Sequence, residues 1–347
     1  MSPRSRRTDA EEELRHELGL LYSQVALELR SRSAADSNGG GDHSDGALLR
    51  PDFGRAAADL TALALRGSPI LGSLLDFFAH QRALATRGPD AELDEFGFDR
   101  EWTESLLPLF RWAYTSYWHV QTSGVEHVPA EGRALLVSNH AGVLPWDGAM
   151  IKTAIFAEHP RPRHARALVA NFFFGTPYLG RLLRRTGQTV GHPDDIRRLL
   201  EQDELVLVFP EGVKGTGKPF TERYRLRRFG RGGFVQSAIR HRAPIIPVSV
   251  VGSEEIYPML GDSSLLARLT GMPYFPITPT FPWLGPLGLL PLPSNWSIRF
   301  HPAVRTDELD PELADDQNVV MEVADRVRET IQHGVWDGLR ERRRAFL

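Results

Sequence analysis

The sequence predicts an α/β fold, with a mixed central sheet flanked by helices and an added helical region at the N-terminus. Three apolar runs are the main evidence, each with the length and composition of a buried strand: residues 134–137, 204–209 and 243–251. Longer stretches with helical periodicity separate them. Because strands that alternate with helices are typical of α/β domains, we expect such a domain from about residue 118 to residue 302.

Four segments are expected along the chain. Residues 1–30 predict an N-terminal helix with a narrow apolar stripe, and residues 31–46, rich in Ser, Asp, Asn and Gly, predict a flexible linker. A second helical region is expected over residues 47–98, followed by the α/β domain over residues 99–345. We expect no signal peptide, since residues 9–13 are acidic where its apolar core should begin. The chain has no run of 18 apolar residues, so no membrane-spanning helix is predicted.

Composition excludes several classes of function. The chain has 347 residues and no cysteine, which rules out a thiol nucleophile, a disulfide scaffold and Cys-ligated zinc. Its net charge of −3 gives no general affinity for polyanions, so we expect no nucleic-acid partner. We also expect no metal ion and no bound cofactor. The oligomeric state is left open.

Within the α/β domain, further elements follow in order. Asp99 is expected to cap a helix that carries aromatic residues on several sides up to Trp118, with a kink at Pro108. Burial explains such a helix better than a membrane interface, although both remain open. Residues 178–185 predict a short basic helix, and the prolines in residues 243–251 indicate an edge strand or a strand start. Residue 320 onward predicts a closing amphipathic helix.

The stretch around His140 is the strongest candidate for chemistry. Residues 134–137 end at Ser138 and Asn139, His140 follows, and Asp147 stands where the next helix should begin. A carboxylate that bonds one imidazole nitrogen fixes the tautomer and leaves the other nitrogen as a general base. The alternative is a helix-capping Asp beside an unrelated turn His.

A second candidate follows the strand at residues 204–209. Phe209, Pro210, Glu211 and Gly212 place a carboxylate at the carboxyl end of this strand, where open α/β sheets bind ligands. Glu211 could there accept a hydrogen bond from a substrate hydroxyl, or it could be a surface turn residue. Residues 212–218 resemble a phosphate-binding loop, but Pro219 stands where a Ser or Thr should hold magnesium. No Gly-x-Ser-x-Gly nucleophile motif is present.

Two other stretches suggest contact with lipid or phosphate. An arginine-rich run with interspersed glycines covers residues 223–233 and is suited to phosphate binding, or else forms a solvated face. Residues 273–296 combine many prolines and glycines with large apolar side chains, which precludes a regular helix. Such a loop either folds over the core or enters lipid headgroups, and the expected membrane contacts are Phe281, Trp283, Leu287 and Leu289.

The order of three motifs resembles that of the glycerolipid acyltransferase family, which includes the lysophosphatidic acid acyltransferases. The motifs are Asn139-His140, residues 209–212 and Pro244-Ile-Ile-Pro247. The resemblance covers roughly residues 118–302. It implies an acyl-CoA or acyl-carrier-protein donor, a lipid acceptor and peripheral association with the cytoplasmic face of a membrane. His140 would be the base, Asp147 would orient it, and Glu211 would share in acceptor binding, with Phe209, Pro210, Gly212 and Lys214 beside it.

The sequence departs from the family pattern twice. Six residues separate His140 from Asp147 where the family has four, which resembles the branch of mono- and diacylglycerol acyltransferases. Lys214 stands where the family usually has Arg, and residues 187–192 lack the family's phosphate-binding Arg. We therefore expect a neutral acceptor, such as a mono- or diacylglycerol, to be used at least as well as lysophosphatidic acid. Candidate contacts to phosphate or to the donor are Arg184, Arg185, Arg228 and Arg231.

The predicted reaction is direct acyl transfer. His140 would take a proton from the acceptor hydroxyl, which attacks the donor thioester, while backbone amides or Lys214 stabilise the oxyanion. A non-catalytic lipid-binding or membrane-scaffold protein of the same fold is the alternative.

Overall fold

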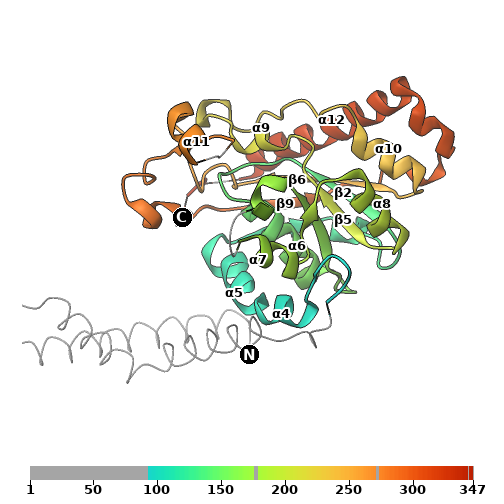
Figure 1. The fold of residues 1–347 in the computed structure, drawn as a ribbon, viewed down its shortest axis with the longest axis horizontal. Helices are drawn as coiled ribbons and strands as arrows, with labels where there is room; N and C mark the ends of the chain where they lie inside the picture. The colour runs from blue at the N-terminus through green and yellow to red at the C-terminus, as the bar shows by residue number, and fades with distance from the viewer. Residues whose placement is uncertain (1–92, 176–178, 271–272, 343, 347) are drawn as a thin grey trace, which may run out of the picture. The chain divides into compact units, whose positions relative to one another are not determined.

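The computed structural model describes residues 93–347 apart from residues 176–178, 271–272, 343 and 347 (Figure 1). Residues 88–347 form one compact unit. The predicted N-terminal helix, the linker and residues 47–92 of the second helical region lie outside the described residues.

A seven-stranded mixed sheet forms the centre of the unit, in the order β1-β9-β6-β2-β5-β3-β4. Neighbouring strands are parallel except β6 and β9, which are antiparallel. The predicted fold class is therefore confirmed. The strands are β1 (Gln121–Ser123), β2 (Ala134–Ser138), β3 (Ala165–Val169), β4 (Thr189–Val190), β5 (Leu205–Val208), β6 (Ile245–Val251) and β9 (Ser297–Phe300).

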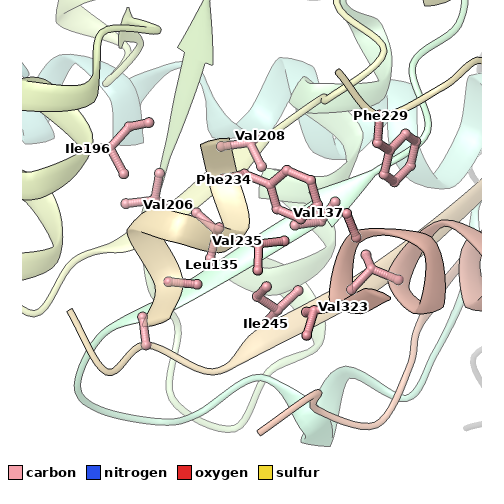
Figure 2. Packing of buried hydrophobic residues seen from close by; sticks show 14 of the residues in the cluster. Leu135, Val137, Ile196, Val206, Val208, Phe229, Phe234, Val235, Ile245 and Val323 are labelled. Atoms are coloured by element: carbon pink, nitrogen blue, oxygen red, sulfur yellow. The ribbon is translucent and has the colours of Figure 1, made fainter. Parts of the chain in front are cut away.

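Helices cover both faces of this sheet, which explains why its central strands are apolar without alternation. On one face, α8 (Pro193–Glu201), α10 (Gly233–Arg240) and α12 (Gln317–Glu341) pack on Leu135, Val137, Val206 and Val208 (Figure 2). On the other face, α6 (Trp146–Glu158) packs on Ala134, Leu136, Leu205 and Leu207. Successive residues of β2 and β5 thus enter two different cores, as the period of two in a strand requires.

The first described helices agree with the prediction. Oδ1 of Asp99 accepts a hydrogen bond from the backbone N–H of Trp102 at 2.9 Å and caps α4 (Arg100–Ser105). Pro108 lies in the first turn of α5 (Leu107–Trp112), where its missing N–H is tolerated, and a short π-helix at residues 113–117 follows. Trp102, Tyr114 and Trp118 are buried, whereas Trp112 is exposed.

Three expectations about local structure were wrong. Residues 93–98 form a turn rather than a helix, because Oδ1 of Asp94 accepts from the N–H groups of Phe96 and Phe98 at 2.8 Å. Asp147 lies inside the first turn of α6 and does not cap it. The strand at residues 245–251 is central, between β2 and β9, so it is no edge strand, although Pro244 does stand directly before its start.

Pro247 is tolerated in this central strand because of where it lies along β9. The N–H of His301 donates to the carbonyl of Pro247 at 2.8 Å, so the proline nitrogen also faces the β9 side. His301 follows the last residue of β9. The missing donor therefore falls where the antiparallel ladder ends.

The remaining elements lie between β3 and β9. They comprise α7 (Leu179–Arg185), α9 (Val213–Thr216), α11 (Ser264–Thr270) and an antiparallel pair, β7 (Gly261–Asp262) with β8 (Pro276–Ile277). Figure 1 shows α11 in orange at the same end of the unit as the loop that follows β8. In that loop the described residues form only a 3-10 turn at Gly285–Leu289, as the breakers predict.

Candidate active site

Three parallel strands bring the candidate residues together. β2 lies between β5 and β6, so the carboxyl ends of all three strands meet at one edge of the sheet. His140 follows β2, Glu211 follows β5 and Glu254 follows β6. This edge is where ligands bind in open α/β sheets.

His140 and Asp147 form a hydrogen-bonded pair. Nδ1 of His140 lies 2.7 Å from Oδ2 of Asp147, whose side chain is 0% exposed. The N–H of Ala141 donates to the same oxygen at 3.0 Å, and the N–H of Gly148 donates to Oδ1 at 2.8 Å. The carboxylate is therefore held in place from both sides. Nε2 of His140 has no hydrogen-bond partner among the described residues and remains available as a base.

The six intervening residues bulge so that the pair can meet. Gly142 has φ +84° and packs close to the loop after β6, where an added Cβ would lie 3.0 Å from the carbonyl of Ser253. Trp146 donates from Nε1 to the hydroxyl of Tyr257 at 3.1 Å. The bulge is thus fastened to residues 253–257.

Glu211 holds the His140 loop from the other side. Its Oε1 accepts from the backbone N–H of His140 at 3.0 Å, and its Oε2 accepts from the N–H of Arg227 at 2.6 Å. The Glu211 side chain is 0% exposed. The expectation that Glu211 binds a substrate hydroxyl does not fit this geometry, because both oxygens already accept backbone hydrogen bonds away from solvent. Its place in the structure is that of a positioning residue.

Sequence reasoning missed the buried charges behind Glu211. Nζ of Lys218 lies 3.5 Å from Oε2 of Glu211 and 3.1 Å from Oε1 of Glu254, and it donates to the carbonyl of Arg225 at 3.1 Å. Burial raises the pKa of Glu254, while Lys218 opposes that rise. Next to it, Glu255 accepts from both Tyr224 and Arg342. The signal in the sequence was the adjacent pair Glu254-Glu255 directly after an apolar strand.

The His140 side chain lines a cavity of about 660 Å³. Phe209 stacks on the imidazole, with ring centroids 4.3 Å apart. Apolar residues of β3, β4 and α10 form much of the wall, and Asn171, Gln188, His192, Thr216, Arg231 and Tyr274 provide polar groups. The predicted residues Phe209, Pro210 and Gly212 line it as well.

Other predicted residues lie elsewhere. Lys214 is exposed on α9 and is not among the cavity-lining residues, which argues against contact with an oxyanion. Of the four arginines proposed to bind phosphate, Arg231 lines the cavity. The other three arginines do not line the cavity. Arg228 is exposed, Arg184 lies over the ring of Phe174, and Arg185 lies over the ring of Trp102.

Residues on either side of β8 connect the cavity to an exposed apolar surface. Pro273 and Tyr274 line the cavity, and the chain then leads to Trp283 and Leu287, which are 72% and 67% exposed. Phe281 is half-buried against Phe275, and Leu289 is 37% exposed. We call the exposed set the apolar rim; it comprises Leu260, Leu265, Leu269, Trp283, Leu284, Leu287 and Leu290.

The two residues that follow the rim residue Leu290 contact the aromatic segment near Trp118. The hydroxyl of Tyr117 donates to the carbonyl of Pro291 at 2.6 Å, and Nε1 of Trp118 donates to that of Leu292 at 3.2 Å. Exposed Trp112 stacks on Tyr117. In the part of the chain that the structure describes, no helix has the length and apolar character needed to cross a bilayer. The same part shows no cluster of three or more His, Asp or Glu side chains placed to hold a metal ion.

Comparisons with known proteins give a family match and two similar mycobacterial proteins. Residues 119–251 match the model of the Acyltransferase family. An uncharacterized protein of Mycobacterium tuberculosis (strain ATCC 25618 / H37Rv) is 52% identical over 258 residues, which cover 74% of this chain and 72% of that protein. An uncharacterized protein of Mycobacterium leprae is 51% identical over 258 residues, which cover 74% of this chain and 70% of that protein.

Two more distant similarities involve proteins with described activities. The "DGAT1/2-independent enzyme synthesizing storage lipids" of Bos taurus is 28% identical over 169 residues, which cover 48% of this chain and 49% of that enzyme. The crystal structure of the 1-acyl-sn-glycerophosphate (LPA) acyltransferase PlsC from Thermotoga maritima shares 17% identity and a TM-score of 0.46, covering 77% of this chain and 89% of that one.

Proposed function

The chain belongs to the Acyltransferase family, and from that premise we propose that it transfers a fatty acyl group from an acyl-CoA or acyl-carrier-protein thioester to a hydroxyl of a glycerolipid. The observation that carries this proposal is the His140–Asp147 pair, whose imidazole faces a largely apolar cavity. Such a cavity suits an acyl chain, and a carboxylate-oriented imidazole suits removal of a hydroxyl proton.

The proposed mechanism needs no covalent acyl-enzyme. With Nδ1–H donated to Asp147, Nε2 of His140 takes the proton of the acceptor hydroxyl as its oxygen attacks the thioester carbonyl carbon. The tetrahedral intermediate then collapses, the carbon–sulfur bond breaks, and the imidazolium returns its proton to the leaving thiolate. Asp147 stabilises the imidazolium in between.

We further propose a neutral acceptor, such as a mono- or diacylglycerol. Arg231 is the one Arg or Lys among the described residues of the cavity wall, and residues 187–192 contribute Gln188 and His192 in place of an arginine. The bovine enzyme to which the chain is similar is described as synthesizing storage lipids, and a neutral acceptor fits a role of that kind.

We also propose that the protein binds one membrane leaflet through the apolar rim. The rim continues from the cavity wall at Pro273 and Tyr274, so an insoluble acceptor could pass from lipid to His140 along it. Aromatic and leucine side chains suit the headgroup boundary.

An acyl-transfer assay tests the proposal. Purified full-length chain is incubated with a labelled acyl thioester and, in parallel, with monoacylglycerol, diacylglycerol or lysophosphatidic acid. We expect a neutral acceptor to be used at least as well as the phosphorylated lipid. A strong preference for lysophosphatidic acid would reject the acceptor assignment, and no transfer to any hydroxyl would favour a lipid-binding protein without activity.

A further inference from the structure

A second, smaller cavity lies beside the first and contains none of the proposed catalytic side chains. Its volume is about 340 Å³, and α4, α5, α6 and α7 contribute its walls. It adjoins the first cavity at four residues that line both: Pro145, Ala149, Leu183 and Gln188. Most of its surface is apolar, including Leu106, Leu107, Phe110, Phe156, Leu179 and Leu182.

One cationic side chain lies in this apolar wall. Lys152, on α6, donates from Nζ to the carbonyl of Thr186 at 2.5 Å. No carboxylate among the described residues pairs with it, so two of its three ammonium donors have no protein partner there. Lysine is rare in this chain: of its 41 Lys and Arg residues, three are lysines, namely Lys152, Lys214 and Lys218. Unlike Arg, a buried Lys can lose its proton.

We propose that this cavity binds a long-chain carboxylate, such as a free fatty acid, with the carboxylate on Nζ of Lys152 and the hydrocarbon chain along the leucine and phenylalanine wall. A ligand with a hydrocarbon chain and no carboxylate would leave the ammonium group of Lys152 buried without a counter-charge, which is unfavourable. A small anion would leave the apolar wall unused. A fatty carboxylate satisfies both features of the cavity.

The charged groups around Lys152 leave it free for such a ligand. Arg166, on β3, is paired with Asp94 at 2.5 Å and with Glu204 at 3.5 Å. His164 lines the cavity and contacts Oε1 of Glu104 at 3.1 Å, and burial lowers its pKa, so it is neutral near pH 7. Burial and the nearby charge of Arg166 lower the pKa of Lys152 to about 7.

Calorimetric titration of the full chain with dodecanoate and with dodecanol, both below micelle-forming concentrations, tests this assignment. Near pH 6.5 we expect dodecanoate to bind at least about tenfold more tightly, as one charge-assisted contact would give. Lys152→Met should remove that preference while binding of dodecanol persists. Arg326→Met, which removes an exposed cation on α12, is the matched control and should keep the preference.

Dependence on pH provides a second arm. Above about pH 7, dodecanoate affinity should fall by about tenfold per pH unit as the free amine loses its proton, while dodecanol affinity stays constant. Lys152→Arg stays charged, so it should keep the preference and lose this decline. Equal affinity for the two ligands in the wild type, or a preference that survives in Lys152→Met, would overturn the proposal. Because binding is read without acyl transfer, a failure here is distinct from a failure of the proposed function.

Discussion

Oε1 of Glu211 accepts a hydrogen bond from the backbone N–H of His140 at 3.0 Å, and this contact joins the loops that follow two neighbouring parallel strands. It favours a role for Glu211 in supporting the loop that carries His140 rather than in binding the proposed acceptor. The two assignments differ in their kinetic consequences.

Glu211→Gln should lower kcat with little change in the KM for the acceptor. Its amide can accept one of the two backbone hydrogen bonds but turns a donor toward the other N–H, so the loop shifts, and small displacements of a catalytic group can cost about 10²-fold. Steady-state kinetics with a neutral acceptor measure both constants. A large rise in KM at unchanged kcat would instead indicate acceptor binding by Glu211.

Lys218→Met should destabilise the fold by about 3–5 kcal/mol, because it leaves the buried carboxylates of Glu211 and Glu254 without their cation. Urea denaturation gives the free energy of unfolding. Lys214→Met is the matched control, since Lys214 is exposed, and should change that energy by less than about 0.5 kcal/mol. Equal stability of the two variants would show that Lys218 is not part of the support.

The half-buried histidine His301 should make stability fall in acid. Burial lowers its pKa to about 4, and Nε2 lies 3.0 Å from the hydroxyl of Ser249. Between pH 6.5 and pH 4 the unfolded chain binds a proton that the folded chain does not, so the free energy of unfolding decreases as pH falls, by at most about 1.4 kcal/mol per pH unit for this group. His301→Asn should flatten the dependence in urea titrations across this range. An unchanged slope would contradict the assignment.

Much of the fold was predictable, because it depends on local pattern. The apolar runs of β2, β5 and β6 needed helices on both faces, and the cap at Asp99 depends on residues three apart. The position of β6 in the sheet was not predictable from its prolines, since it depends on where β9 ends.

Some features of the candidate site were predictable from the sequence, and others were not. His140 and Asp147 are close in sequence, so their pairing was predictable despite the longer loop. The role of Glu211 depends on which donors reach it, and the Lys218–Glu254 pair joins residues 36 positions apart. Such contacts follow from the three-dimensional arrangement of the loops, which single-sequence patterns do not contain.

Replacing both Trp283 and Leu287 by Asp should release the protein from lipid vesicles without unfolding it. Both side chains are largely exposed, so the fold loses little packing, while charged groups oppose entry into the headgroup region. Flotation with vesicles containing anionic lipid measures binding, and circular dichroism monitors folding. Trp336→Asp, an exposed tryptophan on α12 outside the rim, is the control and should still float. Undiminished flotation of the double variant would place the membrane contact elsewhere.

The central claim is that His140, oriented by Asp147, is the general base of acyl transfer. The most direct measurement is the rate of labelled acyl transfer to a neutral glycerolipid by wild type, His140→Ala and Asp147→Asn, each shown to be folded. The account predicts a loss of about 10²–10⁴-fold in both variants, with the Asn variant favouring the wrong imidazole tautomer. Transfer within a few-fold of wild type by folded His140→Ala would contradict it.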